Sequence, residues 1–172
     1  MNLKSNDLSQ TLRGEIQPYI NYLGDFPLDQ IPSIESILSS NTTTTTTSFI
    51  VNTDKSTESG THWFAMVVQQ SRDGDYSSMF IEPMGLDDLL IEALSPLKYW
   101  CKTARVTQYL PYAIQPLNST LCGAYCALIL SRLPLYNYNL NQLTCVEFSR
   151  DLLTLNEARV ASWWYKRRDA CA

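Results

Sequence analysis

The chain has 172 residues, of which 45% are hydrophobic and 17% are charged, and its formal net charge is −4. A chain of this size and apolar content can bury a core as a single domain, so disorder is excluded for most of residues 1–172. The acidic balance argues against duplex nucleic acid as the main partner, because that binding needs many cationic contacts to phosphates. The one basic run, Lys166-Arg167-Arg168, is typical of cations at the negative end of a helix.

No apolar run approaches the roughly 20 residues that cross a bilayer, and the polar stretch Asn2–Gln10 lacks the apolar segment of a signal peptide. We therefore expect neither a membrane protein nor a secreted one. Five sparse cysteines are an odd set that does not predict a disulfide scaffold, which is typical of a reducing compartment inside a cell.

His62 is the only histidine, and this limits the chemistry open to the chain. A zinc site built from several imidazoles is impossible, and any imidazole acid or base must be His62. We expect no metal and no cofactor.

The first predicted elements are a helix and a strand. Residues Ser5–Ile16 have apolar side chains four residues apart, which is typical of an amphipathic helix, and Pro18 ends it. The tract Thr42–Thr47 is rich in hydroxyl groups and predicts a loop that leads into a strand over Ser48–Asn52.

A hairpin is predicted next. The run His62–Val68 is aromatic and branched, as in a buried strand that begins at His62, and Asp73-Gly74-Asp75 marks a tight turn. The second strand is expected over Ser78–Glu82. In an antiparallel pair the far end of the second strand lies beside the near end of the first, so this geometry brings Glu82 towards His62.

The second half of the chain predicts a strand over Arg105–Leu110 and four helices. The helix Leu121–Leu130 is apolar on most sides and is expected to be buried, with Asn118-Ser119-Thr120 as cap residues and an end at Leu133 before Pro134. The other helices are expected over Leu86–Trp100, Leu140–Leu152 and Asn156–Arg168. Together these elements predict an α+β fold in which helices flank a small mixed or antiparallel sheet.

Cys122 lies in the first turn of the buried helix, where amide donors and the positive end of the helix dipole favour a thiolate nucleophile. Gly123 beside it leaves room for a substrate carbonyl. A catalytic cysteine needs a base and a group that orients the base, and His62 with Glu82 is the pair that the hairpin offers. Gln115, on the loop before the helix, could stabilise a tetrahedral oxyanion.

Each of these residues also has a purely structural interpretation. A cysteine in an apolar helix is usually a packing residue, as we expect for Cys126. A single histidine, glutamate or glutamine at a strand end or in a loop is more often a hydrogen-bonding residue than a catalyst. The presence of all four residue types in one constellation favours the catalytic interpretation.

Three segments carry a family resemblance: Ser59-Gly60-Thr61-His62-Trp63, Phe80-Ile81-Glu82-Pro83-Met84-Gly85, and Gln115 followed by Cys122-Gly123-Ala124-Tyr125-Cys126. In order and spacing they resemble the adenain family of cysteine proteases, the maturation proteases of adenoviruses, with relatives in virophages and Polinton-type elements. The similarity extends to Asn21–Phe26 and Phe49–Asn52 and reaches as far as Leu133.

The resemblance implies a cysteine protease domain over residues 1–172 with His62 as base, Glu82 as its orienting group, Cys122 as nucleophile and Gln115 as oxyanion donor. It also implies substrate-binding roles for three further residues, namely Trp63, Gly123 and Asp25. The substrates would be viral capsid and core precursor polypeptides cut at glycine-rich, small-residue motifs. The protein would then act in the virion and the interior of the infected cell, in cytoplasm or nucleus.

The adenovirus enzymes are activated by a capsid-derived peptide, joined through a disulfide, and by DNA, so a viral activating peptide is a candidate partner. The position that matches the disulfide cysteine is Ala104, and the nearest thiol is Cys101. The net charge of −4 offers little attraction to DNA. We therefore expect that neither activator transfers and that the protein is active without DNA.

Three alternatives stay open. A SUMO or ubiquitin-like deconjugating protease shares the His-Trp and Gln-Cys-Gly elements, but those enzymes usually orient histidine with aspartate, where this chain has Glu82. A catalytically inactive relative could serve as a scaffold or binding module. An acyltransferase would share the acyl-enzyme step with a protease.

Overall fold

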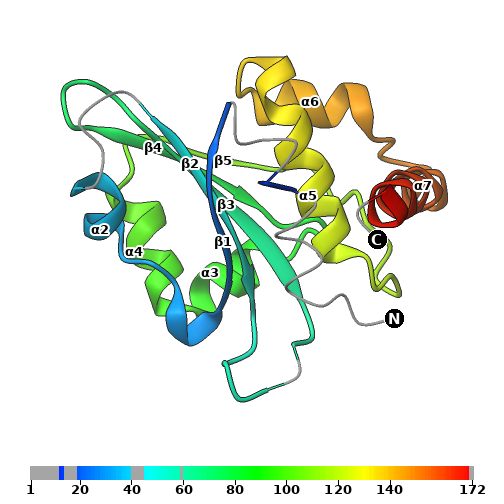
Figure 1. The fold of residues 1–172 in the computed structure, drawn as a ribbon, viewed down its shortest axis with the longest axis horizontal. Helices are drawn as coiled ribbons and strands as arrows, with labels where there is room; N and C mark the ends of the chain where they lie inside the picture. Colours follow the sequence, from blue (N-terminus) through cyan, green and yellow to red (C-terminus); the bar gives the residue numbers. More distant parts are fainter. Residues whose placement is uncertain (1–11, 14–18, 40–44, 59, 171–172) are drawn as a thin grey trace.

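The computed structural model describes residues 12–13, 19–39, 45–58 and 60–170 and has an α+β fold around a five-stranded mixed sheet (Figure 1). The strands follow the chain order across the sheet: β1 (Asn21–Pro27), β2 (Thr46–Asn52), β3 (Trp63–Gln70), β4 (Tyr76–Ile81) and β5 (Thr107–Tyr109). The three central strands are antiparallel, whereas β1 runs parallel to β2 and β5 runs parallel to β4. The predicted fold class is confirmed.

Helices cover both faces of the sheet (Figure 1). One face carries α2 (Ile34–Ser39), α3 (Asp87–Ala93) and α4 (Ser95–Thr103), and the other carries α5 (Cys122–Arg132), α6 (Leu140–Glu147) and α7 (Leu153–Ala170). Two short 3-10 helices, η1 (Leu28–Gln30) and η2 (Leu133–Tyr136), follow β1 and α5. Among the described residues, we find no helix that is both long and apolar enough to span a bilayer.

Strand β3 shows why the sheet holds two separate cores. Phe64, Met66 and Val68 pack with the residues of α2 and α4, while Ala65 and Val67 pack with those of α5. This alternation follows from the period of two along a strand, and every one of these side chains is buried because both faces are covered. Helix α5 is accordingly buried over nine consecutive residues, from Cys122 to Leu130.

The predicted hairpin is confirmed, with β3 and β4 paired antiparallel around the turn at Asp73-Gly74-Asp75. The prediction of a single helix over Leu86–Trp100 is wrong. The chain forms α3 and α4 with a break at Leu94, whose backbone is extended at φ −111° and ψ 96°. Pro96 lies in the first turn of α4, where the missing N–H of proline costs nothing because that position has no intrahelical acceptor.

Several boundaries also differ from the prediction. Strand β2 begins at Thr46 rather than Ser48, because the β-branched Thr46 and Thr47 pair with Gln69 and Val68. Strand β5 is shorter than the strand predicted over 105–110. The helix predicted to end at residue 152 ends at 147, and the helix predicted to begin at residue 156 begins at 153. Helix α5 ends at Arg132, within one residue of the end predicted at Leu133, and Pro134 lies in the first turn of η2, which follows directly. The helix predicted over 5–16 lies outside the described residues except at 12–13, which are helical.

Candidate active site

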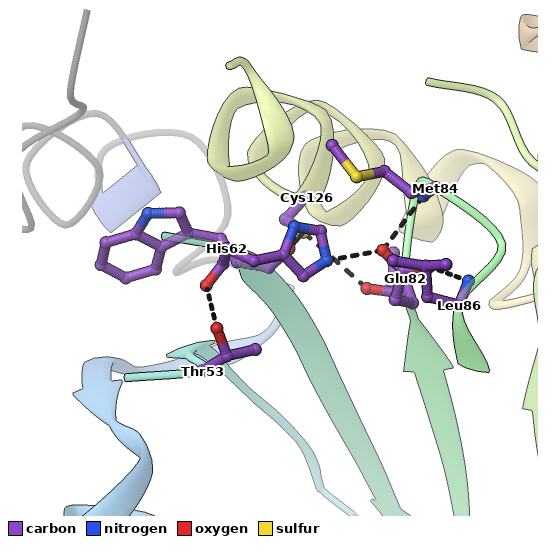
Figure 2. Close-up of polar contacts among 8 residues, drawn as sticks. Thr53, His62, Glu82, Met84, Leu86 and Cys126 are labelled. Carbon is purple, nitrogen blue, oxygen red and sulfur yellow. Dashed lines mark hydrogen bonds and ion pairs between the residues drawn. The ribbon is translucent and has the colours of Figure 1, made fainter. Parts of the chain in front are cut away.

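His62 and Glu82 lie at the same end of the central hairpin. His62 directly precedes β3 and Glu82 directly follows β4, and Ala65 pairs with Ile81 across the two strands. The His62 Nε2 atom lies 2.7 Å from Glu82 Oε1, and the two side chains point toward each other (Figure 2). The backbone carbonyl of His62 accepts a 2.9 Å hydrogen bond from the Thr53 N–H, which fixes the residue against the end of β2.

The Glu82 carboxylate is fully buried and is held by a turn of its own chain. Its Oε1 accepts from the backbone N–H of Met84 at 3.0 Å, and its Oε2 accepts from the N–H of Leu86. Gly85, between these two donors, has φ +75° and lets the chain curl around the carboxylate. Both oxygens of Glu82 are therefore engaged, and one side of Oε1 is directed at His62 (Figure 2).

Cys122 is the first residue of α5 and is only 4% exposed. Burial disfavours the imidazolium of His62, but the hydrogen bonds and charges of Cys122 and Glu82 outweigh this and raise the pKa of His62 to about 9. Nε2 faces Glu82, which leaves Nδ1 as the ring nitrogen that is open to another partner. The same imidazole is thus in contact with the Glu82 carboxylate and under the influence of the Cys122 thiol.

Gln115 lies on the loop between β5 and α5. Its backbone N–H donates to the Pro83 carbonyl at 3.0 Å, so this loop is joined to the turn that follows Glu82. The side chain is 1% exposed, and neither its Nε2 nor its Oε1 has a hydrogen-bond partner among the described residues. An unsatisfied buried amide costs about 1–3 kcal/mol, and such a group is often explained by function.

Helix α5 is also bonded to the strands beneath it. The Cys126 thiol, one turn after Cys122, lies 3.8 Å from the carbonyl oxygens of both Trp63 and Ile81, the residues next to His62 and Glu82 (Figure 2). Cys126 is fully buried, and burial raises the pKa of its thiol well above its ordinary value. It stays protonated as a donor, which agrees with the expected packing role.

Two residues of α7 that were not predicted from the sequence contact the segments around Gln115 and Cys122. The Asn156 side chain donates to the carbonyl oxygen of Ile114, the residue before Gln115, at 3.0 Å. Glu157 accepts from the Ser119 hydroxyl at 2.7 Å and from the Tyr125 hydroxyl at 3.1 Å, on either side of Cys122.

A signal for Asn156 is present in the sequence. It occupies the same helical face as the buried Val160 and Trp163, four and seven residues further on, where a polar residue needs a partner.

The three residues predicted to bind substrate lie in different places. Gly123 is buried as the second residue of α5, and Trp63 is buried as the first residue of β3, in the same core cluster as Cys122. Asp25 lies on the edge strand β1, with β2 between it and β3, and accepts a hydrogen bond from Tyr22. The structure does not bring Asp25 together with His62, and the substrate-binding roles stay predictions.

A metal centre has no support in the described part of the chain, where no three His, Cys, Asp or Glu side chains lie close enough to hold an ion. The side chains gathered here are a thiol, an imidazole, a carboxylate and a primary amide. This set suits acyl transfer through a thioester.

Comparisons with known proteins define the fold class but not the family. No family model matches the sequence, and no curated protein matches it. Among solved structures, the central domain of the uncharacterized Lpg1148 protein from Legionella pneumophila is similar over 99% of both chains, with a TM-score of 0.55 and 14% identity. The ASFV pS273R protease matches with a TM-score of 0.41 and 18% identity, over 76% of this chain and 57% of that one. Membership of the adenain family stays a prediction.

Proposed function

We propose that the protein is a cysteine endopeptidase in which Cys122, His62, Glu82 and Gln115 form the active site. The observation that carries this proposal is the 2.7 Å contact between His62 Nε2 and Glu82 Oε1, on an imidazole whose pKa is also raised by Cys122. The unpartnered buried amide of Gln115 supplies the remaining group that acyl transfer needs.

In the acylation step the Cys122 thiolate attacks the carbonyl carbon of a peptide bond. The carbonyl π electrons move to oxygen, and the oxyanion accepts from the Gln115 side-chain N–H and from the backbone N–H of Cys122. That backbone N–H is available because the first N–H groups of a helix have no intrahelical acceptor; in α5 the Tyr125 N–H is the one that returns to Leu121. The C–N bond then breaks, and the His62 imidazolium gives its Nδ1 proton to the leaving amine.

In the deacylation step water attacks the thioester carbon. His62, now neutral, takes one proton from that water, and the C–S bond breaks to release a carboxylic acid, which loses its own proton to solvent, and the Cys122 thiolate. The imidazolium is regenerated beside Glu82, which holds the ring through Nε2 in both steps. Glu82 thus acts as a positioning residue and does not contact the substrate.

The proposed substrates are precursor polypeptides of a virus or related element, cut at glycine-rich motifs in the virion or the infected cell. Two observations support a small-residue motif. The Cys122 residue is only 4% exposed, and its neighbour Gly123 carries no side chain, so residues with little bulk approach the sulfur most easily. The resemblance of the three site segments to the adenain family supplies the substrate class. Activity without DNA remains part of the proposal, in keeping with the net charge of −4.

The test of the nucleophile is alkylation with less than one equivalent of iodoacetamide, followed by peptide mapping. Exposure alone would favour Cys145, the exposed cysteine among those described, over the buried Cys122. We expect Cys122 to react first, because it is the proposed nucleophile at the start of α5 with His62 as its base. Reaction at Cys145 with Cys122 unmodified would contradict an activated nucleophile.

The test of the reaction uses glycine-rich precursor peptides beside SUMO and ubiquitin probes that end in Gly-Gly. We expect cleavage of the precursor peptides and no turnover by Cys122→Ala. Faster turnover of the SUMO or ubiquitin probes would show that the protein is a deconjugating protease and not a viral maturation protease. The proposed mechanism at Cys122 would remain the same. Full turnover by Cys122→Ala would overturn the mechanism itself.

A further inference from the structure

A second site lies between helices α5 and α7, away from the thiol. It is a pocket of about 270 Å³ lined by seven residues: Leu128, Arg132, Arg159, Ser162, Trp163, Lys166 and Arg167. Four of the seven carry a positive charge and none is acidic, in a protein whose net charge is −4. Cations that converge on one pocket repel one another, and an anion in the pocket removes that repulsion.

The cations come from two helices. Arg132 is the last residue of α5, whereas the α7 residues 159, 162, 163, 166 and 167 recur every three or four positions and share one helical face. The basic run that the sequence analysis assigned to a helix end therefore contributes Lys166 and Arg167 to the wall of a pocket. A ligand held by both helices would cross-link them.

One of these cations, Arg159, is paired with a carboxylate, that of Glu147. Glu147 accepts hydrogen bonds from Arg159 and, at 2.7 Å, from the Tyr136 hydroxyl. Arg159 also donates to the Glu147 carbonyl oxygen. Within the described part of the chain, Arg132 and Lys166 have no carboxylate within 4.0 Å. These two residues retain charge that is available to a ligand.

Trp163 contributes its ring to the pocket wall. It is 8% exposed, and its indole N–H is itself buried, so the donors that a ligand can reach are those of the cations and of Ser162. The Arg167 guanidinium carbon lies 4.5 Å from the centre of the ring, so that face is covered and does not offer a stacking surface for a base. A ligand with acceptor oxygens fits this donor-rich pocket better than one with an aromatic ring.

We propose that this pocket binds a small phosphate-bearing anion with more than one negative charge, of the oligophosphate class. Arginine forks and lysine match phosphate oxygens well, and the Ser162 hydroxyl is a further donor. At about 30 Å³ for a water molecule in the liquid, a pocket of about 270 Å³ has room for more than one phosphate group. A duplex would instead need a long cationic surface.

Binding is tested with sodium tripolyphosphate by calorimetry and by thermal unfolding, on the full chain at moderate salt. We expect saturable binding and a rise in melting temperature, because a ligand that binds only the folded state stabilises it. Arg132→Gln and Lys166→Gln should each weaken binding about tenfold, as the loss of one charge-assisted hydrogen bond implies. The matched control is Lys102→Gln, at an exposed position near the end of α4, which should bind like the original chain.

The remaining outcomes decide against the proposal. Absence of binding to a chain that unfolds cooperatively would overturn it, and so would equal weakening by Lys102→Gln and Arg132→Gln. A further outcome is that the protein binds duplex DNA more tightly than tripolyphosphate, with all three substitutions weakening that binding equally. This result would show a diffuse cationic surface for nucleic acid and no specific phosphate pocket. Because binding is measured directly, these results do not depend on whether the chain is a protease.

Discussion

The side-chain amide of Asn156 donates a 3.0 Å hydrogen bond to the carbonyl oxygen of Ile114, so helix α7 contacts the residue directly before Gln115. The same side chain donates to the Ser149 carbonyl at 2.7 Å and accepts from the Ser149 N–H at 2.9 Å. Asn156 is 2% exposed, and it joins the loop of the candidate oxyanion donor to the segment between α6 and α7. The position of Gln115 is therefore set from a distant part of the chain.

Replacement of Asn156 by Ala should lower kcat more than it changes KM. The substitution leaves the Ile114 carbonyl without its donor, so we expect the Gln115 loop to shift by a fraction of an ångström. Such a shift should lower kcat by roughly tenfold to a hundredfold. The unfolding free energy should fall by about 1–3 kcal/mol. Steady-state kinetics at a temperature where the variant is folded measures the first effect, and denaturant unfolding measures the second.

The matched control is Leu155→Ala, the neighbouring residue on α7, which is 59% exposed. It should leave kcat unchanged. An Asn156→Ala protein that loses stability but keeps the original kcat would limit Asn156 to a structural role.

The contacts of α7 with the site could not be predicted from the sequence, whereas the contact between His62 and Glu82 could. His62 and Glu82 are 20 residues apart on one hairpin, so a turn signal and two strand patterns were enough to predict that they approach each other. Asn156 and Ile114 are 42 residues apart, and Glu157 and Ser119 are 38 apart. No local pattern encodes such pairs, because they depend on how two helices pack.

Local signals also compete with one another. The apolar spacing over 86–100 predicts one helix, yet the chain breaks at Leu94, where Pro96 favours a new helix start. Pro134 was predicted to end a helix at Leu133, and α5 does end at Arg132; Pro134 then lies in the first turn of η2, where proline is accepted.

Gln115→Met should separate catalysis from stability. Methionine has a shape similar to glutamine but no polar amide, so the substitution removes two buried atoms that have no partner among the described residues. The unfolding free energy should rise by about 1 kcal/mol or more, while kcat falls on the order of a hundredfold with the loss of an oxyanion donor. Denaturant unfolding and steady-state kinetics on the same protein measure the two effects. Loss of stability would instead indicate that the amide has a structural partner.

Gly85→Ala and Gly74→Ala form a second pair of test and control. Both glycines have positive φ, +75° and +91°, so each substitution should cost about 1 kcal/mol from backbone strain. A Cβ at Gly85 would also lie 3.0 Å from the Ala113 Cβ, whereas nothing lies within 4 Å at Gly74.

We therefore expect Gly85→Ala to be the less stable of the two and to reduce kcat, because the turn that bonds Glu82 must shift. Gly74→Ala should retain full activity. Equal stability and equal kcat in the two variants would show that the close contact has no consequence.

The titration of His62 tests the candidate dyad directly. Since the chain has one histidine, its imidazole C–H signals in an NMR titration are unambiguous. We expect a pKa of about 9 in the original protein, compared with an ordinary value of 6.5. Burial alone would lower the pKa, so Cys122→Ala and Glu82→Gln, which each remove a group that favours the imidazolium, should both bring it down. A pKa at or below 6.5 in the original protein would contradict the proposed line of three groups.

The same shift predicts how activity and stability depend on pH. The folded-state pKa of His62, about 9, lies above its ordinary value of 6.5, so the imidazolium stabilises the fold fully below about pH 6.5. That contribution declines as pH rises and is lost once pH passes about 9. The unfolding free energy of the original protein should fall over this interval, and the fall should be smaller in Cys122→Ala.

In steady-state assays kcat should decline above about pH 9, because the proton that His62 gives to the leaving amine is then absent. A kcat that keeps rising with pH beyond that point would mean that another group supplies this proton.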